Sequence, residues 1–316
     1  MIKYWYSENI GKVGISMKRL LFILNSKSGK HQIKPHVCDM IDLYVSAGYE
    51  VTVHTTQAQG DAREVAETRG GGYDMIVCSG GDGTACEVVN GLLALDKVPC
   101  LGYIPAGTTN DYAKSLGIPT KLMEAARNTI EGQAYACDVG DFNGHFFVYI
   151  AAFGLFTDVS HQTPQETKNM IGHLAYILEG VKSLASVKSY HLKVQCDDIE
   201  ITDDFIYGMV TNSISVGGFK MFTGKDMLLD DGLFEMLLIR MPQNLMDLQA
   251  IIGALLLQKV EDKYMVYTKT KEVTIICEDG MAWTLDGEDG GEHEVAHIFN
   301  CRKAIEIVRP VEVIEK

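Results

Sequence analysis

Hydrophobic residues in the first part of the chain gather in short runs separated by amphipathic stretches. Four runs have the length and apolar character of buried strands: Leu20–Leu24, Val51–Thr55, Met75–Cys78 and Cys100–Ile104. Five stretches repeat apolar residues at helical spacing: His36–Ala47, Ala62–Thr68, Ala85–Leu95, Thr109–Ser115 and Leu122–Ile130. Because strands and helices alternate, we expect an α/β domain over residues 17–139, built on an open parallel sheet of the Rossmann-like type.

Beyond about residue 140 the pattern changes to alternating apolar and polar positions. Seven runs have this period of two: His145–Ala152, Tyr190–Gln195, Phe205–Val210, Leu233–Ile239, Val266–Lys271, Val273–Cys277 and Val295–Phe299. Two longer helical patterns interrupt them, Lys168–Ser186 and Asn244–Val260. The alternation predicts a second, mainly antiparallel β-sandwich domain over residues 140–303.

The two ends of the chain are less regular. Residues 1–16 show no clear period, and Met17 leads directly into the first strand, so we expect an N-terminal extension before the fold. The segment 304–316 contains a last strand, Ala304–Val308, which either returns to the first domain or stays with the second.

Charge and cysteine content exclude several classes of protein. The chain has 316 residues, with 28 Lys and Arg against 42 Asp and Glu, a formal net charge of -14 that disfavours nucleic acid as a partner. Its eight cysteines are scattered and form no CxxC pair, which is typical of free thiols in a reducing compartment. No apolar run approaches the roughly 20 residues of a membrane span, and no signal peptide is visible. We therefore expect a cytoplasmic protein.

The segment Met75–Thr84 carries the strongest chemical signal, a buried strand that enters a glycine turn and then a helix. Glycines allow backbone amides to approach a phosphate closely, and the start of a helix adds partial positive charge. A nucleotide phosphate is the expected ligand. The dinucleotide fingerprint fails at Cys86, and a turn whose Asp82 and Thr84 only cap the helix is the alternative.

Two other turns follow predicted strands. Asn25–Lys30 offers several backbone amides and one Lys ammonium to an anion, although a solvated Asn/Ser/Gly turn explains it equally well. Gly107–Asp111 offers hydroxyls and amides at a helix start, with a carboxylate, Asp111, that could hold Lys30 or a metal-bound water. A simple helix cap by Thr109 or Asn110 is the alternative there.

Acidic residues mark two turns late in the chain. Asp286 and Glu288 flank a glycine at a strand end, where we expect extended backbone to point both carboxylates in similar directions. One of them is the candidate base for transfer of a phosphoryl group to an alcohol, with an acidic β-turn as the alternative. The loop 228–233 has the oxygens that a hard divalent cation prefers, and is equally a hairpin turn.

Six ordered motifs between Lys18 and Pro310 together resemble the bacterial diacylglycerol kinase-like lipid kinases: NSKSGK, SGGDGT, IPAGTTNDYA, AAFGLFTDV, LLDDGLFEMLLI and LDGEDGG. The catalytic domain of that family is related to sphingosine kinase and, more distantly, to NAD kinase. Departures from its usual motifs are Lys27, in place of a proline, and the Ala85-Cys86-Glu87 run after the glycine turn.

The resemblance implies an ATP-dependent kinase that phosphorylates a lipid hydroxyl, with Mg²⁺. It assigns Glu288, Asp286 and Asp82 to catalysis, Glu288 as the usual proton acceptor, and a magnesium loop to Asp231 with the carbonyls of Leu228 and Leu233. Lys30, Asp111 and Asp138 correspond to its charge network. The candidate nucleotide-binding residues are Asn25, Ser26, Lys27, Ser28, Gly29, Lys30, Thr56, Gly80, Gly81, Asp82, Gly83, Thr84, Ala85, Cys86, Thr108, Asn110 and Asp111.

A lipid substrate requires access to a membrane surface. Residues 167–193 carry four lysines against one glutamate and could dock on a bilayer, and Asn244–Val260 is similarly apolar. Packing against the core is the favoured interpretation of both helices. An NAD kinase-like enzyme and a non-catalytic nucleotide- or lipid-binding regulator remain the alternative functions. The identity of the lipid and the oligomeric state, a homodimer included, are open.

Overall fold

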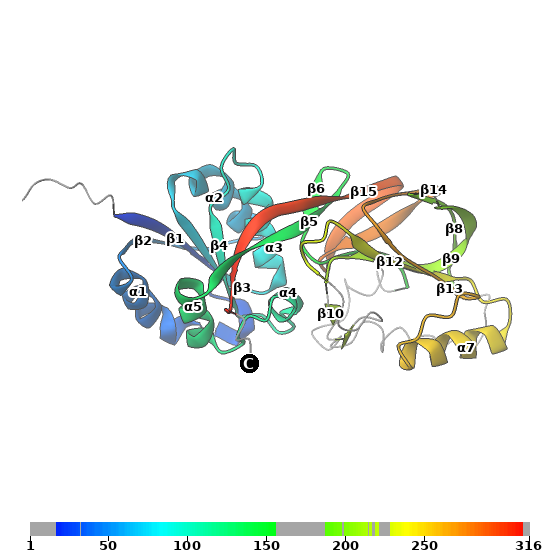
Figure 1. Cartoon of the computed structure of the whole chain (residues 1–316), viewed down its shortest axis with the longest axis horizontal. Helices are drawn as coiled ribbons and strands as arrows, with labels where there is room; N and C mark the ends of the chain where they lie inside the picture. Colours follow the sequence, from blue (N-terminus) through cyan, green and yellow to red (C-terminus); the bar gives the residue numbers. More distant parts are fainter. Residues whose placement is uncertain are drawn as a thin grey trace, which may run out of the picture.

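The computed structural model describes residues 17–31, 33–155, 187–197, 199–213, 215–216, 219–220 and 228–311, with residues 30, 31, 215, 216, 219 and 220 described by their backbone only. The predicted extension 1–16 and the predicted helix Lys168–Ser186 lie outside the described residues. The chain has a mixed α/β fold rich in strands (Figure 1). In the described part of the chain, no helix is long and apolar enough to cross a membrane.

Four parallel strands form the N-terminal part of the sheet. They are β1 (Lys18–Leu24), β2 (Tyr49–Thr55), β3 (Met75–Gly80) and β4 (Cys100–Pro105), in the order β2-β1-β3-β4. All four predicted strands are confirmed. Strands β1, β3 and β4 are largely buried, whereas β2, at the edge of the sheet, alternates half-buried and exposed positions. The finer Rossmann-like description stays a prediction.

Helices cover both faces of these strands (Figure 1). The helices are α1 (Val37–Ser46), α2 (Asp61–Arg69), α3 (Asp82–Leu92), α4 (Asp111–Ser115) and α5 (Leu122–Glu131). Short 3₁₀ turns lie at Ser28–His31, Lys34–His36 and Gly70–Gly72. Helix α3 begins three residues before its predicted start, since the glycine turn itself enters the first helical turn.

The remaining strands of this sheet pair mainly antiparallel. They are β5 (Gln133–Phe142), β6 (His145–Phe147), β7 (Ile150–Gly154), β8 (Tyr190–Cys196), β9 (Ile199–Thr211), β12 (Phe234–Arg240), β13 (Met265–Thr270), β14 (Glu272–Leu285) and β15 (Glu288–Arg309). Helix α7 (Leu245–Leu256) connects β12 to β13, and β10 (Ser215–Val216) pairs with β11 (Phe219–Lys220) as a separate ribbon. A core of aromatic rings lies between these strands, with Trp283 against Phe142 and Phe153 at centroid distances of 4.9 and 5.0 Å.

Strand β15 joins the two parts of the molecule. It pairs with β14 and β5, and Ile307 near its end pairs in parallel with Leu101 of β4. The last predicted strand, Ala304–Val308, therefore returns to the parallel part of the sheet, which was the question the sequence left open. The predicted domain boundary at residues 139 and 140 lies inside β5, and the division into domains stays a prediction.

Four parts of the sheet differ from the sequence-based expectation. Strand β5 was not predicted, and β14 and β15 extend well beyond the predicted runs Val273–Cys277 and Val295–Phe299, because their outer parts carry many exposed polar residues. The predicted strand His145–Ala152 is two strands. It breaks at Val148 and Tyr149, whose amides donate to the Asp286 carboxylate at 2.7 and 2.9 Å instead of to a neighbouring strand.

Candidate active site

The carboxyl ends of β1, β2 and β3 open into one cavity of 470 Å³. Eight predicted site residues line it: Asn25, Lys27, Ser28, Thr56, Gly81, Gly83, Thr84 and Glu288. Gln57, Ala58, Gln59 and Glu87 complete the lining. Residues from three strand ends and from the start of β15 are thus brought to a single hollow, as the parallel arrangement of the strands predicts.

The glycine turn after β3 presents backbone amides at this cavity. Helix α3 makes its first intrahelical bond from Ala85 N to Gly81 O at 3.1 Å, so the amides of its first turn precede that bond and are available to a ligand. A side chain at Gly107 would lie 2.6 Å from the Gly81 Cα, and only glycine permits the two turns to meet so closely. This arrangement can bind phosphate oxygens.

The loop after β1 is tied to the same turn by Asn25. Asn25 N donates to Ser79 O at 2.8 Å, its Nδ2 donates to Thr84 Oγ1 at 3.3 Å, and its Oδ1 accepts from Lys27 N at 3.0 Å. Asn25 therefore shapes the loop that places the exposed Lys27 beside the cavity. Ser26 is half-buried, Gly29 adopts a positive φ of 53°, and the side chain of Lys30 lies outside the described residues.

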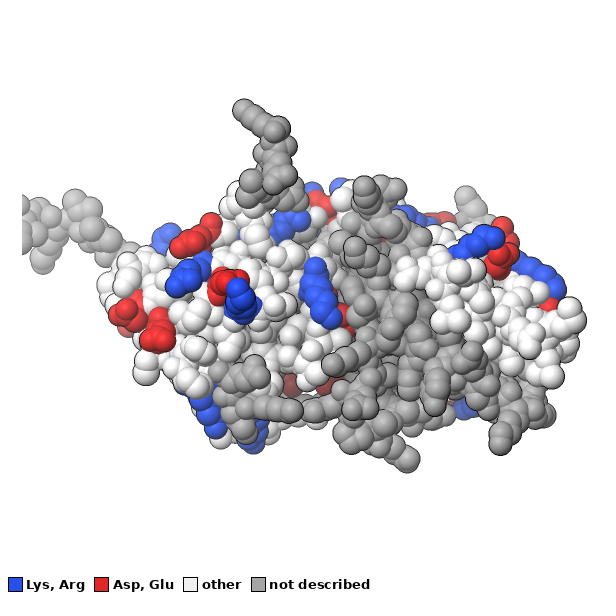
Figure 2. Space-filling view, turned by 90° about the horizontal axis from the view of Figure 1, so that it is seen from below, with Lys and Arg blue, Asp and Glu red and all other residues white. Residues whose placement is uncertain are grey.

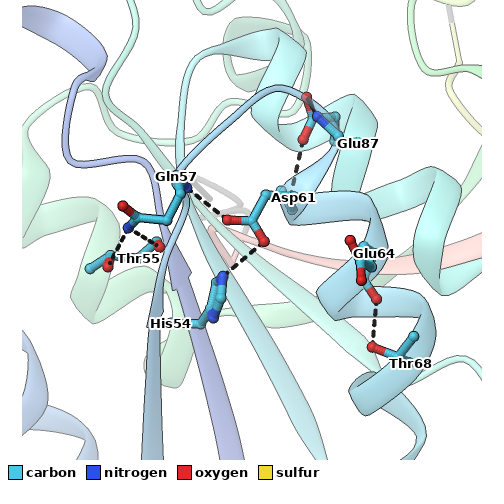
Figure 3. A network of polar contacts seen from close by, with 9 residues as sticks. His54, Thr55, Gln57, Asp61, Glu64, Thr68 and Glu87 are labelled. Carbon is cyan, nitrogen blue, oxygen red and sulfur yellow. Dashed lines mark hydrogen bonds and ion pairs between the residues drawn. The ribbon is translucent and has the colours of Figure 1, made fainter.

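The loop after β2 is held by acidic residues that sequence analysis missed (Figure 3). Asp61 accepts from Gln57 N at 2.7 Å and pairs with His54 Nε2 at 3.1 Å. Glu87, from α3, accepts from the amides of Gly60 and Ala62 at 2.9 and 3.2 Å. An Asp at a helix start is a local signal that could have identified Asp61, whereas the contacts of Glu87 reach across 25 residues or more.

Asp82 connects the glycine turn to α4 rather than projecting into the cavity lining. Its carboxylate accepts from Asp111 N at 3.0 Å and from Tyr112 N at 3.2 Å. The pKa of Asp82 is raised to about 6, because burial and the nearby charges of Asp111 and Asp286 outweigh the opposing effect of the two amides. Asp82 thus orders the two turns against each other.

The remaining predicted contacts lie behind or beside the cavity. Asn110 accepts from Gly107 N and donates to Gly107 O, both at 2.9 Å, so it closes its own turn, and Asp111 pairs with Lys114 at 3.2 Å. Thr108 is exposed and is not among the lining residues. Gly80 and Ala85 are buried, and Cys86 lines a neighbouring cavity of 360 Å³.

The two late acids point in different directions, so the expectation of parallel carboxylates is wrong. Asp286 and Gly287 have φ values of 51° and 85°, a tight turn instead of extended backbone. The Asp286 carboxylate is buried and accepts from the amides of Val148, Tyr149 and Ile150 at 2.7, 2.9 and 3.0 Å. Burial raises the pKa of Asp286 and these amides oppose the rise. With its oxygens occupied by these amides, Asp286 anchors the turn.

Glu288, in contrast, faces the glycine turn. A methyl group at Gly83 would lie 3.0 Å from Glu288 Oε1, and Gln59 Nε2 donates to Glu288 Oε2 at 3.3 Å. The side chain is exposed and lines both the main cavity and its neighbour. The structure therefore brings the acid and the phosphate-binding amides together from positions about 200 residues apart in the chain.

The predicted magnesium loop, 228–233, is fastened to β5 and β15 by Asp138. The fully buried Asp138 carboxylate accepts from Gly232 N at 2.6 Å and Lys303 N at 2.8 Å, and Asp231 accepts from Leu233 N at 3.0 Å. The described residues contain no cluster of three His, Cys, Asp or Glu side chains that could hold a metal. One carboxylate with two backbone carbonyls still fits Mg²⁺, which usually keeps several waters.

Comparison with known proteins identifies the family. The family model of the diacylglycerol kinase catalytic domain matches residues 19–142. A diacylglycerol kinase of Bacillus subtilis (strain 168) is 36% identical over 302 residues, which span 95% of this chain and 99% of that protein. A diacylglycerol kinase of Staphylococcus aureus (strain MRSA252) is 32% identical over 301 residues, 95% of each chain.

A solved structure shares the fold. The crystal structure of a diacylglycerol kinase from Bacillus anthracis str. Sterne has a TM-score of 0.73 to this chain at 22% identity, and the match covers 93% of this chain and 97% of that one. The similarity to the sequence relatives extends over nearly the whole chain. The chain therefore belongs to the diacylglycerol kinase family and is a lipid kinase.

Proposed function

We propose that this protein transfers the γ-phosphoryl group of ATP to the free hydroxyl of diacylglycerol or a closely related membrane lipid. The observation that carries the proposal is the position of Glu288, whose carboxylate lies against Gly83 in the cavity lined by the glycine turn. Phosphoryl transfer to an alcohol requires phosphate-binding donors and a proton acceptor within one site. Glu288 and the first turn of α3 supply the two.

Each group then has a defined task. The amides at the start of α3 and the Lys27 ammonium bind the phosphate oxygens, and a hydrogen bond between the half-buried Asn25 and the buried Thr84 holds the two loops together. The hydroxyl oxygen attacks the γ-phosphorus while the bond to the β-phosphate oxygen breaks. Glu288 accepts the hydroxyl proton, so that ADP and a phosphorylated lipid leave.

Magnesium belongs to the same proposal. Asp231 with the carbonyls of Leu228 and Leu233 would hold one ion, which would stiffen the loop that Asp138 fastens to the sheet. Magnesium bound to the nucleotide supplies positive charge that offsets the negative charge of the triphosphate. The cavity itself also requires such positive charge, because Glu87 and Glu288 add negative charge to its lining.

The alternative functions are less well supported. An NAD kinase-like enzyme would share the glycine turn, but the relatives that match nearly the whole chain are named diacylglycerol kinase. A non-catalytic regulator would not need an exposed carboxylate against the phosphate-binding turn, as Glu288 provides. Diacylglycerol is a membrane lipid, and we propose that the enzyme is cytoplasmic and works at the inner face of the membrane.

A product assay tests the proposal. The protein is incubated with Mg²⁺ and γ-labelled ATP together with diacylglycerol, a sphingoid base or NAD, and the products are identified by mass. We expect the label in phosphatidic acid. Label in NADP, or ATP binding without transfer to any acceptor, would overturn the proposal.

A further inference from the structure

Gln59, on the loop after β2, reaches the candidate proton acceptor from the opposite side of the cavity. Its Nε2 donates to Glu288 Oε2 at 3.3 Å, although the two residues are 229 positions apart in the chain. Both side chains line the main cavity of 470 Å³ and the neighbouring cavity of 360 Å³. Among the described residues, Gln59 is the one donor to the Glu288 carboxylate. The pair therefore lies at the boundary between the two cavities.

The backbone on both sides of Gln59 is fixed by other residues. Gln57 N donates to Asp61 at 2.7 Å, and Gly60 N donates to Glu87 at 2.9 Å (Figure 3). Gly60 has a φ of 84°, a left-handed conformation that favours glycine and leads the chain directly into α2. Because none of these contacts involves the exposed Gln59 side chain, we expect the loop to keep its shape when that side chain is replaced.

The turn that carries Glu288 fixes its backbone but leaves its carboxylate free to move. Leu285 pairs with Glu288 across the turn, and the Asp286 carboxylate is bound by three backbone amides. The Glu288 side chain is exposed, and its rotational freedom opposes any single orientation. Gln59 holds Oε2, whereas Oε1 lies toward the glycine turn, 3.0 Å from the position of a methyl group added at Gly83. One oxygen is thus held, and the other is available for a proton.

We infer that Gln59 is a positioning residue for phosphoryl transfer, whose side-chain amide holds the Glu288 carboxylate in the orientation in which Oε1 accepts the hydroxyl proton. The inference rests on the proposed function, in which Glu288 is the proton acceptor. An amide that donates to a carboxylate also favours the ionised form, which is the form that can accept a proton. The two effects act together, since a proton acceptor must be both aligned and ionised at the moment of transfer.

The other charges around Glu288 form a constant background. The titratable groups that line the two cavities with it are Lys27, Arg63, Cys86, Glu87, His145 and Asp289. Among the described residues, none of these groups forms a hydrogen bond or ion pair with the Glu288 carboxylate. Asp82 and Asp286 are close to the turn, but backbone amides bind both carboxylates. More distant charges add little, because Lys and Arg are interspersed with Asp and Glu on the face in Figure 2, and salt at 0.1 M screens charges beyond about 10 Å.

A series of substitutions at position 59 tests the inference by steady-state kinetics of the full chain with ATP, Mg²⁺ and diacylglycerol over a range of pH. Gln59→Leu removes the donor and is expected to lower kcat about 3–10-fold, with little change in the KM for ATP. It should also move the acid limb of the kcat profile to higher pH. Gln59→Glu, which adds a like charge, should move this limb further up, and Gln59→Lys, which supplies a charged donor, should move it down. Loss of a structural contact alone would not order the limbs by charge.

Gln195→Leu is the matched control. Gln195 Nε2 donates to Glu200 Oε2 at the same distance of 3.3 Å, on strands β8 and β9 outside the cavity lining, so this variant should keep the wild-type kcat and pH profile. Equal acid limbs in all variants of Gln59, or a rise in the KM for ATP alone, would overturn the inference while the proposed function stands, provided that Glu288→Gln abolishes the acid limb. If Glu288→Gln keeps both kcat and the acid limb, the proposed role of Glu288 fails, and the inference fails with it.

Discussion

Of the two turns that meet in the candidate active site, one acts through its backbone and the other through its side chains. The glycine turn between β3 and α3 offers backbone amides, and its close approach to Gly107 leaves no space for side chains. The turn between β14 and β15 acts through side chains, one buried in hydrogen bonds and one exposed to the cavity. The glycine turn therefore acts as a binding surface through the shape of its backbone. In the turn between β14 and β15, Asp286 anchors the backbone, and Glu288, two residues later, is the candidate proton acceptor.

Replacement of the exposed Glu288 is expected to have the largest effect and tests whether this residue, and not Asp286, takes part in the chemistry. Glu288→Gln is expected to lower kcat by about 10²–10⁴-fold, because the hydroxyl proton loses its acceptor, while ATP binding is kept. Steady-state kinetics and calorimetric titration with ATP measure the two effects. Glu292→Gln, an exposed acid further along β15, serves as the control. A small kcat effect of Glu288→Gln would show that the turn does not supply the base.

Replacement of the buried acid is expected to affect folding first. Asp286→Ala leaves the amides of Val148, Tyr149 and Ile150 without their acceptor. We expect the free energy of unfolding to fall by about 3 kcal/mol or more, measured by urea denaturation. The exposed Glu294→Ala should change it little. Normal stability with abolished transfer would instead make Asp286 a participant in the chemistry.

The pH dependence of stability tests the burial of Asp82, the carboxylate that joins the glycine turn to α4. Its pKa is raised to about 6 in the folded protein, above the ordinary value of 3.8, so between about pH 4 and 6 the folded state binds more protons than the unfolded state. Stability contributed by this group is therefore present at low pH and is lost as the pH rises through that window, by about 2–3 kcal/mol.

The difference between wild type and Asp82→Asn isolates this contribution from the other titrating groups. Urea denaturation at a series of pH values should show the wild type losing more stability than Asp82→Asn between pH 4 and 6. Parallel pH profiles of the two proteins would mean that Asp82 is as well solvated as an ordinary surface carboxyl group.

The smallest expected effect concerns the loop after β2. Glu87→Ala removes the acceptor of the Gly60 and Ala62 amides, so the loop that contributes Thr56 and Gln59 to the cavity becomes less ordered (Figure 3). The KM for ATP should rise about 3–10-fold with a smaller change in kcat. Glu64→Gln, on the neighbouring helix α2 and outside the cavity lining, should behave as wild type. A fall in kcat alone would give Glu87 a different role.

Local patterns determined how much the sequence could predict. The four parallel strands and the glycine turn were found, because short runs rich in apolar or β-branched residues and a Gly-rich strand–helix turn are visible within ten residues. Strand β5 was not found, since the buried Asp138 and Asp141 interrupt its apolar pattern. The outer part of β15 was not found, since its exposed positions carry polar residues that resemble a loop. In the site, Asp286 and Glu288 were both identified, but their divergence depends on the positive φ of Asp286. The contacts of Gln59 and Glu87 depend on long-range packing, which no local pattern shows.

A crystal structure with a non-hydrolysable ATP analogue and Mg²⁺ tests the central claim most directly. The account predicts γ-phosphate oxygens about 2.7–3.2 Å from the first-turn amides of α3, with the Glu288 carboxylate on the open side of the phosphorus. A triphosphate bound outside the cavity of Asn25, Gly83 and Thr84, or a Glu288 side chain turned away from the phosphate, would contradict it.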